Sequence, residues 1–242
     1  MVRVVVAGRL VAAVASVALL GGAVVGSGSG VGGGKAVAVS EVPVRTSPIA
    51  GQLAGLPATV DGAKIVVGKP DAPRTAQVLV DPKCGHCARF EEAGGESLLK
   101  LAAAGDVKIE YLLASFLDRG GASGSVKAVN ALRASADAGK FAEFHAAVFA
   151  SQPKGRFTDE LLLRIADRVP GLRGAEFDAA VKDRTYEGWV AEAQKGFEAT
   201  GAQGTPMVLV EGAPVGSRDG SLFDAGAFAR ALRGVGIGSS AP

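Results

Sequence analysis

Short apolar runs between residues 59 and 113 have the length and the alternation that are typical of β-strands. An Asp61-Gly62 turn stands before the first run, and a segment with two prolines, residues 69–73, separates it from the second. In the third run, apolar residues alternate with Lys108 and Glu110. The pattern therefore predicts three strands, at residues 63–67, 76–80 and 107–113.

Residues 88–104, between the second and third predicted strands, are rich in Ala, Leu, Glu and Lys and favour a helix. Strand, helix and strand then form a right-handed βαβ unit. Helical composition follows over five consecutive segments: residues 125–139, 140–151, 158–169, 175–182 and 186–200. Two more strand-like runs and a last helix are expected at residues 207–211, 214–216 and 221–233. This order predicts an α/β fold with a helical insertion between the βαβ unit and a C-terminal ββα unit.

The first 30 residues have the pattern of a signal peptide or a membrane anchor. Arg3 and Arg9 precede a stretch with no charged residue from Leu10 until Lys35. Its apolar part is short for a membrane span of about 20 residues, which favours a signal peptide. The uncharged residues that follow leave an uncleaved membrane anchor as the alternative. The arginines predict that the rest of the chain lies outside the cytoplasm, either secreted or anchored to the cell membrane.

The composition after this segment indicates a linker and one folded domain. Residues 31–57 are mostly Gly, Ser, Ala, Val and Pro, which predicts a flexible linker. Residues 58–236 are then the domain. Of the 242 residues, 48% are hydrophobic and the net charge is only +2. The positive residues are dispersed without interleaved aromatics, so we expect no nucleic-acid partner.

The only two cysteines, Cys84 and Cys87, stand where the second predicted strand gives way to a helix. The free N–H groups and the positive end of the helix dipole at that place stabilise a thiolate on Cys84. We expect His86 to stabilise the same negative charge. Cys87, one turn further on, is in reach to form a disulfide. The spacing predicts Cys84 as the attacking sulfur and Cys87 as the resolving one.

Other uses of the two cysteines fit the sequence less well. A zinc site would need two more ligands, and beyond carboxylates the chain offers only His86 and His145. Covalent haem attachment needs a histidine directly after the second cysteine, where Ala88 stands. A purely structural disulfide would close so short a loop that it would stabilise little. We therefore expect neither a metal nor a cofactor.

Four motifs in this order resemble the DsbA-type disulfide oxidoreductases of the bacterial cell envelope, which have a thioredoxin fold with a helical insertion. They are Gly68-Lys69-Pro70-Asp71-Ala72-Pro73, Cys84-Gly85-His86-Cys87, Gly139-Lys140-Phe141 with Phe144-His145, and Gly204-Thr205-Pro206. The resemblance covers about residues 59–233. It implies that Pro206 is a cis proline packed against the cysteines and that the backbone of Thr205 pairs with the substrate.

The chain departs from that family in two places. Val78 stands where the family has a buried acid, and Asp81-Pro82-Lys83 stands where it has aromatic residues. Asp81 or Glu110 could replace the acid, and Lys83 would lower the pKa of Cys84 further. The Gly85-His86 pair matches protein disulfide isomerases, and a histidine here favours an oxidant. His145, among apolar neighbours, is expected in the core.

The sequence thus predicts an extracytoplasmic thiol–disulfide oxidoreductase that introduces disulfides through Cys84 and Cys87. Its partners would be unfolded or partly folded exported proteins with thiols, and a quinone-linked membrane protein that reoxidises it. A reductase or isomerase of the cell envelope is the first alternative, and the reduction potential distinguishes it. The second is a non-catalytic thioredoxin-like binding module, in which Cys84 would resist alkylation.

Overall fold

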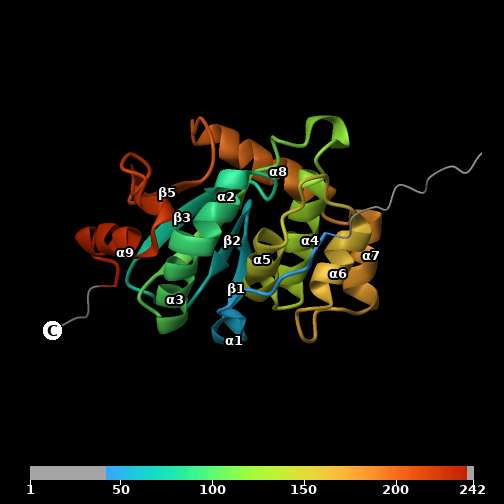
Figure 1. Cartoon of the computed structure of the whole chain (residues 1–242), viewed down its shortest axis with the longest axis horizontal. Coiled ribbons are helices and arrows are strands. Elements are labelled where there is room, and N and C mark those ends of the chain that lie inside the picture. The colour runs from blue at the N-terminus through green and yellow to red at the C-terminus, as the bar shows by residue number, and fades with distance from the viewer. Residues whose placement is uncertain (1–41, 239–242) are drawn as a thin grey trace, which may run out of the picture. The chain divides into compact units, whose positions relative to one another are not determined.

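The computed structural model describes residues 42–238, which form a six-stranded sheet with helices on both faces (Figure 1). The order in the sheet is β1-β2-β4-β3-β5-β6. Only β3 and β4 run parallel, and every other neighbouring pair is antiparallel. The strands are β1 (Ala58–Asp61), β2 (Lys64–Val67), β3 (Thr75–Val80), β4 (Lys108–Leu113), β5 (Met207–Val210) and β6 (Ala213–Pro214).

Apart from α1, which lies in the predicted linker, the helices follow the predicted order. They are α1 (Ala50–Leu53), α2 (Gly85–Phe90), α3 (Glu96–Ala104), α4 (Ser125–Asp137), α5 (Phe141–Ala150), α6 (Asp159–Ala166), α7 (Ala175–Asp183), α8 (Glu187–Ala199) and α9 (Ala225–Gly234). A π-helical turn, η1 (Glu91–Gly95), joins α2 to α3, and two 3₁₀ turns are η2 (Arg119–Gly121) and η3 (Ser221–Phe223). Helices α4 to α8 stand between β4 and β5, which confirms the helical insertion and the predicted fold class.

Two boundaries differ from the sequence expectation. The first predicted strand is one arm of a hairpin, because β1 precedes it and the turn between them uses Gly62 at a φ of 55°. Residues 42–57, the second half of the predicted linker, pack against the domain. Ile49, Leu53 and Leu56 are buried there. Ile49 and Leu53 are four residues apart, so they lie on the same face of the short helix.

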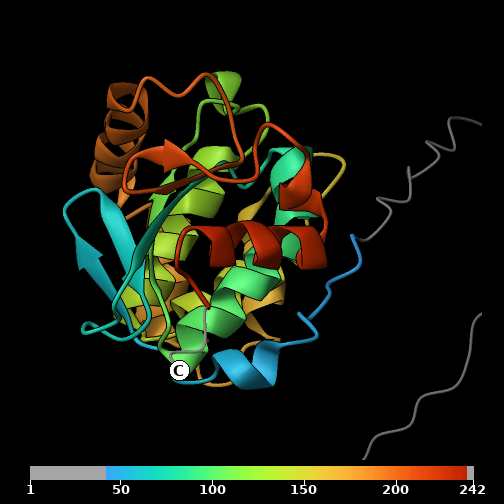
Figure 2. The ribbon, with the colours of Figure 1, turned by 90° about the vertical axis from the view of Figure 1, so that its left-hand side faces the viewer.

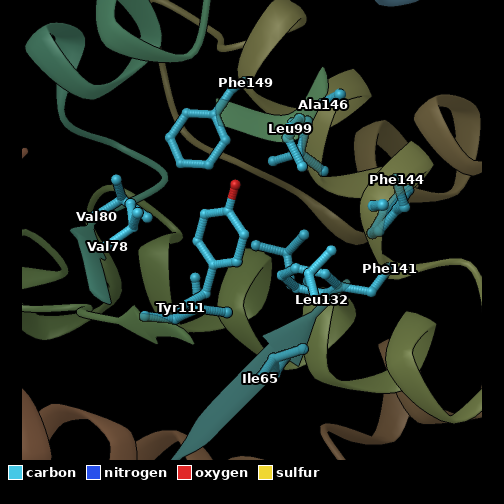
Figure 3. Packing of buried hydrophobic residues seen from close by; sticks show 14 of the residues in the cluster. Ile65, Val78, Val80, Leu99, Tyr111, Leu132, Phe141, Phe144, Ala146 and Phe149 are labelled. Carbon is cyan, nitrogen blue, oxygen red and sulfur yellow. The ribbon is translucent and has the colours of Figure 1, made fainter. Parts of the chain in front are cut away.

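The two faces of the sheet bury different sets of side chains. One face, which α2, α3 and α5 cover, receives the side chains of Val78 and Val80 from β3 and of Tyr111 from β4. Figure 3 shows the Tyr111 ring among the buried side chains of this face. On the other face, Leu79 and Leu112 pack against Phe197 of α8. This alternation follows from the period of two along a strand.

The main core also contains polar side chains. His145 of α5 is fully buried, and its ring lies 4.4 Å from that of Tyr111, which confirms its expected place in the core. Its Nε2 lies 3.1 Å from Oε1 of Glu91, which is also buried. Figure 2 shows α9 across the continuous helix of α2, η1 and α3.

The predicted signal or anchor, residues 1–30, lies outside the described residues, and so does the first part of the linker. Within residues 42–238, none of the helices combines the length and the apolar character needed to span a bilayer.

Candidate active site

The turn after β3 places Cys84 at the amino end of α2. The Cys84 N–H donates to the Asp81 carbonyl at 2.9 Å, and Cys84 is the N-cap residue of the helix. Cys87 lies within the first helical turn. The side-chain amide of Gln152, just beyond α5, donates to the carbonyls of Pro82 (2.7 Å) and Cys84 (3.0 Å) and so holds the turn in place.

The two cysteines have very different surroundings. Cys84 is half-buried, whereas Cys87 has no exposed surface. The pKa of Cys84 is lowered to about 5, chiefly because the Cys87 thiol donates to its sulfur, with further help from Thr205 and from the main-chain N–H groups of Cys87 and His86; partial burial opposes this shift. Burial raises the pKa of Cys87 strongly, and the neighbouring Cys84 sulfur raises it further. The reduced pair thus holds one thiolate and one thiol.

Thr205 meets Cys84 across 121 residues of sequence, with its carbonyl oxygen 3.4 Å from the Cys84 Sγ. Its buried hydroxyl has no conventional hydrogen-bond partner within the described residues, and it contributes to the low pKa of Cys84. The Thr205–Pro206 peptide bond is cis, as the resemblance implies. Because β5 runs antiparallel to β3, this bond lies at the sheet end where β3 delivers the cysteines.

His86 and Lys83 lie close to Cys84 in sequence, but their side chains are not among the main causes of its low pKa. The His86 ring is exposed and lies 6.0 Å from the ring of Phe223, and the residue acts on the sulfur through its main-chain N–H. The Lys83 ammonium donates to the Pro153 carbonyl at 2.6 Å. The electrostatic effect comes from thiol, hydroxyl and backbone donors rather than from the two expected cations.

Asp81, not Glu110, is the acid that lies beside the cysteines. The Asp81 side chain is fully buried and accepts hydrogen bonds from the Ser125 hydroxyl and from the N–H groups of Lys83 and Leu117. Burial raises the pKa of Asp81, and the charge on Cys84 adds to that effect. Glu110 points to the opposite face of the sheet, where it pairs with Lys64 at 2.6 Å.

Gln152, Ser125 and the Thr205 hydroxyl are the site residues that sequence reasoning missed. Each reaches the cysteine turn from an element distant in sequence, so no local motif marks it. Within residues 42–238, no group of three or more His, Cys, Asp or Glu side chains is placed to hold a metal ion.

A surface thiolate with a buried partner thiol, at a helix amino end and beside a cis-proline loop, defines a thiol–disulfide oxidoreductase. Comparison with known families agrees, because a family model described as thioredoxin matches residues 60–222. The chain belongs to the thioredoxin family.

Solved structures of thiol–disulfide oxidoreductases have the same fold. MdbA from Actinomyces oris is 25% identical with a TM-score of 0.62, over 74% of this chain and 89% of that one. MdbA from Corynebacterium matruchotii is 22% identical with a TM-score of 0.59, over 66% and 86%. Oxidised BdbD from Bacillus subtilis is 22% identical with a TM-score of 0.56, over 75% and 95%.

A search of curated proteins matched a hydroxyurea phosphotransferase from Kitasatospora aureofaciens, 66% identical over 32 residues. The match spans 13% of this chain and 9% of that protein. So short a segment carries no functional argument.

Proposed function

We propose that the protein is an oxidant that introduces disulfides into exported proteins through Cys84 and Cys87. The observation that carries this proposal is the separation of the two thiol pKa values, with Cys84 at about 5 and Cys87 raised by burial. A stabilised thiolate favours the reduced protein, and a favoured reduced form makes the disulfide a stronger oxidant. His86 is proposed to support this oxidising character through its main-chain N–H, which stabilises the Cys84 thiolate.

In the proposed reaction, a substrate thiolate attacks the Cys84 sulfur of the oxidised protein. The Cys84–Cys87 bond breaks, a mixed disulfide with Cys84 forms, and the Cys87 sulfur leaves and takes up a proton. A second substrate thiolate then attacks the substrate sulfur of the mixed disulfide. The substrate gains a disulfide, Cys84 leaves as the stabilised thiolate, and the protein has accepted two electrons.

The exposed face of Cys84 and the loop before Pro206 form the proposed contact with the substrate. Thr205 would offer main-chain groups to an extended substrate segment. The partners are unfolded or partly folded proteins with thiols, and a quinone-linked membrane protein that takes the two electrons and restores the disulfide. The N-terminal pattern of residues 1–30 supports a place outside the cytoplasm, where disulfides persist.

The equilibrium of the full-length dithiol in glutathione buffers tests the direction of the reaction. We expect a reduction potential less negative than about −200 mV, on the oxidising side of the glutaredoxin range. A potential near the thioredoxin value of about −270 mV would assign the protein to the reductase alternative. Rapid alkylation of Cys84 after mild reduction would distinguish an oxidant or a reductase from a non-catalytic binding module, in which the thiol would be inert.

A further inference from the structure

Four loops meet at the end of the sheet that carries Cys84. The carboxyl ends of β3 and β4 pair there, since Val80 lies opposite Leu113. The amino end of β5 lies at the same end, and Gln152 ties the loop after α5 to the cysteine turn. We call the exposed surface of these loops the active-site rim; it comprises residues 81–90, 114–124, 151–158 and 200–206, at the upper edge of Figure 1.

The charged side chains of the active-site rim are unevenly distributed. Its basic residues are Lys83, Arg89, Arg119, Lys154 and Arg156. Asp81 and Asp118 are its only acids. The whole chain, by contrast, is nearly balanced, with 26 Lys and Arg against 24 Asp and Glu. The excess of positive charge at the dithiol is therefore local.

Neither acid presents its charge to the surface. Asp81 is fully buried. Both carboxylate oxygens of Asp118 accept main-chain N–H groups at the start of α4, from Ser123, Gly124 and Val126. The cations, by contrast, are available, because Arg119, Lys154 and Arg156 are exposed and none has an ion-pair partner among residues 42–238.

Carboxylates on the elements that flank the active-site rim have other partners. Asp159 of α6 pairs with Lys127 at 2.6 Å, and Glu160 faces the same lysine and Arg164. Glu198 of α8 accepts from the Gln194 amide. Near η3, Asp219 and Asp224 accept from the N–H groups of Ser221 and Ala227. Of these carboxylates, Asp159 forms an ion pair, and its cation is Lys127 rather than a residue of the rim.

The active-site rim also carries an exposed apolar side chain. Phe116, three residues beyond β4, is 39% exposed and stacks on Phe197 with ring centroids 5.3 Å apart. It is the only exposed large aromatic side chain among the described residues. A surface that carries an exposed aromatic ring and unpaired cations is suited to a polypeptide with apolar and acidic residues.

We propose that the active-site rim is a docking surface for acidic polypeptide segments, so that the protein reacts preferentially with cysteines that have Asp or Glu nearby in sequence. This inference rests on the proposed function and names its substrate class. Acidic residues would be attracted by Arg119, Lys154 and Arg156 while the cysteine approaches Cys84. Electrostatic attraction of this kind raises the rate of encounter more than the lifetime of the complex.

Two dithiol peptides that differ only in flanking charge test the docking surface. One carries four Glu residues around its cysteines and the other carries Gln at the same places. The full-length oxidised protein should oxidise the Glu peptide about tenfold faster at low ionic strength, the lower end of electrostatic rate gains. The ratio of the two rates should approach one near 1 M salt, where the screening length is about 3 Å.

Charge-removing variants locate the effect. Lys154→Gln with Arg156→Gln should lower the Glu-to-Gln rate ratio at least about threefold at low salt, because rate gains of this kind come from the summed charge. The matched control is Lys69→Gln with Lys108→Gln. It removes two positive charges near the amino ends of β3 and β4, at the end of the sheet away from the active-site rim, and should keep the wild-type ratio. Both rates are measured on the same preparation, so a partly inactive variant does not change the ratio.

Three outcomes would overturn the inference. One is equal rates for the two peptides at low salt, and another is an equal loss of the ratio in both double variants. The third is that Lys154 and Arg156 support binding to vesicles with anionic lipid but not the peptide preference. Failure to oxidise either peptide would instead contradict the proposed function itself.

Discussion

At the residue scale, the chemistry depends on how a few buried groups surround two sulfur atoms. Cys84 is stabilised as a thiolate by donors from its own turn and from Thr205, whereas Cys87 is kept protonated by burial. Asp81 is the carboxyl group that the described part of the chain places beside this pair, and its hydrogen-bond donors are the Ser125 hydroxyl and two main-chain N–H groups. Burial is the main cause of its raised pKa, and the charge on Cys84 adds a smaller effect in the same direction, so we expect the Asp81 charge to act on the thiolate in turn.

Replacing Asp81 tests this coupling. In Asp81→Asn, loss of the repelling charge should lower the pKa of Cys84 below about 5. An amide also puts an N–H group where an oxygen accepted one, which should cost about 1–3 kcal/mol of unfolding free energy. The measurements are thiolate absorbance against pH and urea unfolding.

Glu110→Gln is the matched control for that experiment, because Glu110 lies on the other face of the sheet and pairs with Lys64. It should leave the Cys84 titration unchanged. A Cys84 pKa that stays the same or rises in Asp81→Asn would show that the carboxyl group does not act on the thiolate.

At the scale of elements, the π-helical turn η1 joins the cysteine helix to the rest of the fold. Gly94 lies against η3 and α9, where an added Cβ would stand 2.6 Å from the Leu222 carbonyl oxygen and 2.9 Å from the Phe228 ring. Both neighbours are buried, and one is backbone, so they have little room to move. Glycine at this position allows the helix to approach the C-terminal unit closely.

Gly94→Ala should therefore destabilise the protein by about 1–3 kcal/mol, the usual cost of overpacking. Gly188→Ala is the same substitution in the exposed face of α8, where nothing lies within 4 Å of the added Cβ. It should not destabilise the protein, because the added Cβ meets no neighbour and alanine has the higher helix propensity. Urea unfolding of both variants measures the difference. Equal stability of the two would contradict the close packing at η1.

At the scale of the whole molecule, the low pKa of Cys84 links stability to redox state and pH. Its folded value of about 5 lies below the ordinary value of 9.0. Between these values, the unfolded reduced chain binds a proton that the folded chain does not. The contribution to stability is therefore fully present above about pH 9 and is lost as the pH falls through about 5. The oxidised protein has no such titration.

We therefore expect the stability of the reduced form, relative to the oxidised form, to rise from pH 6.5 to 8.5. Urea unfolding of both forms at pH 6.5, 7.5 and 8.5 measures this difference, and the contributions shared by the two forms cancel. The raised pKa of Cys87 acts in the opposite direction, but only above its ordinary value of 9.0. If the stability difference between the two forms stayed constant across this pH range, the folded protein would not stabilise the Cys84 thiolate.

The sequence by itself determined the features that local patterns encode. The two cysteines at a strand-to-helix junction, the Thr205-Pro206 dipeptide and the helical block between two strand-rich units could all be predicted. Strand alternation, helix composition and turn residues act over a few neighbouring positions, so they are visible in the chain. The hairpin partner β1 and the packed segment at 42–57 were missed because short elements give weak periodic signals.

Only the tertiary structure decided how the site works. It brought Thr205 to Cys84 across 121 residues, chose Asp81 over Glu110 as the neighbouring acid, and directed Lys83 to a carbonyl instead of the thiolate. It also buried Cys87 while leaving Cys84 accessible. Burial and hydrogen bonding between distant segments set each of these outcomes, and both depend on how the elements pack rather than on the residues beside each position.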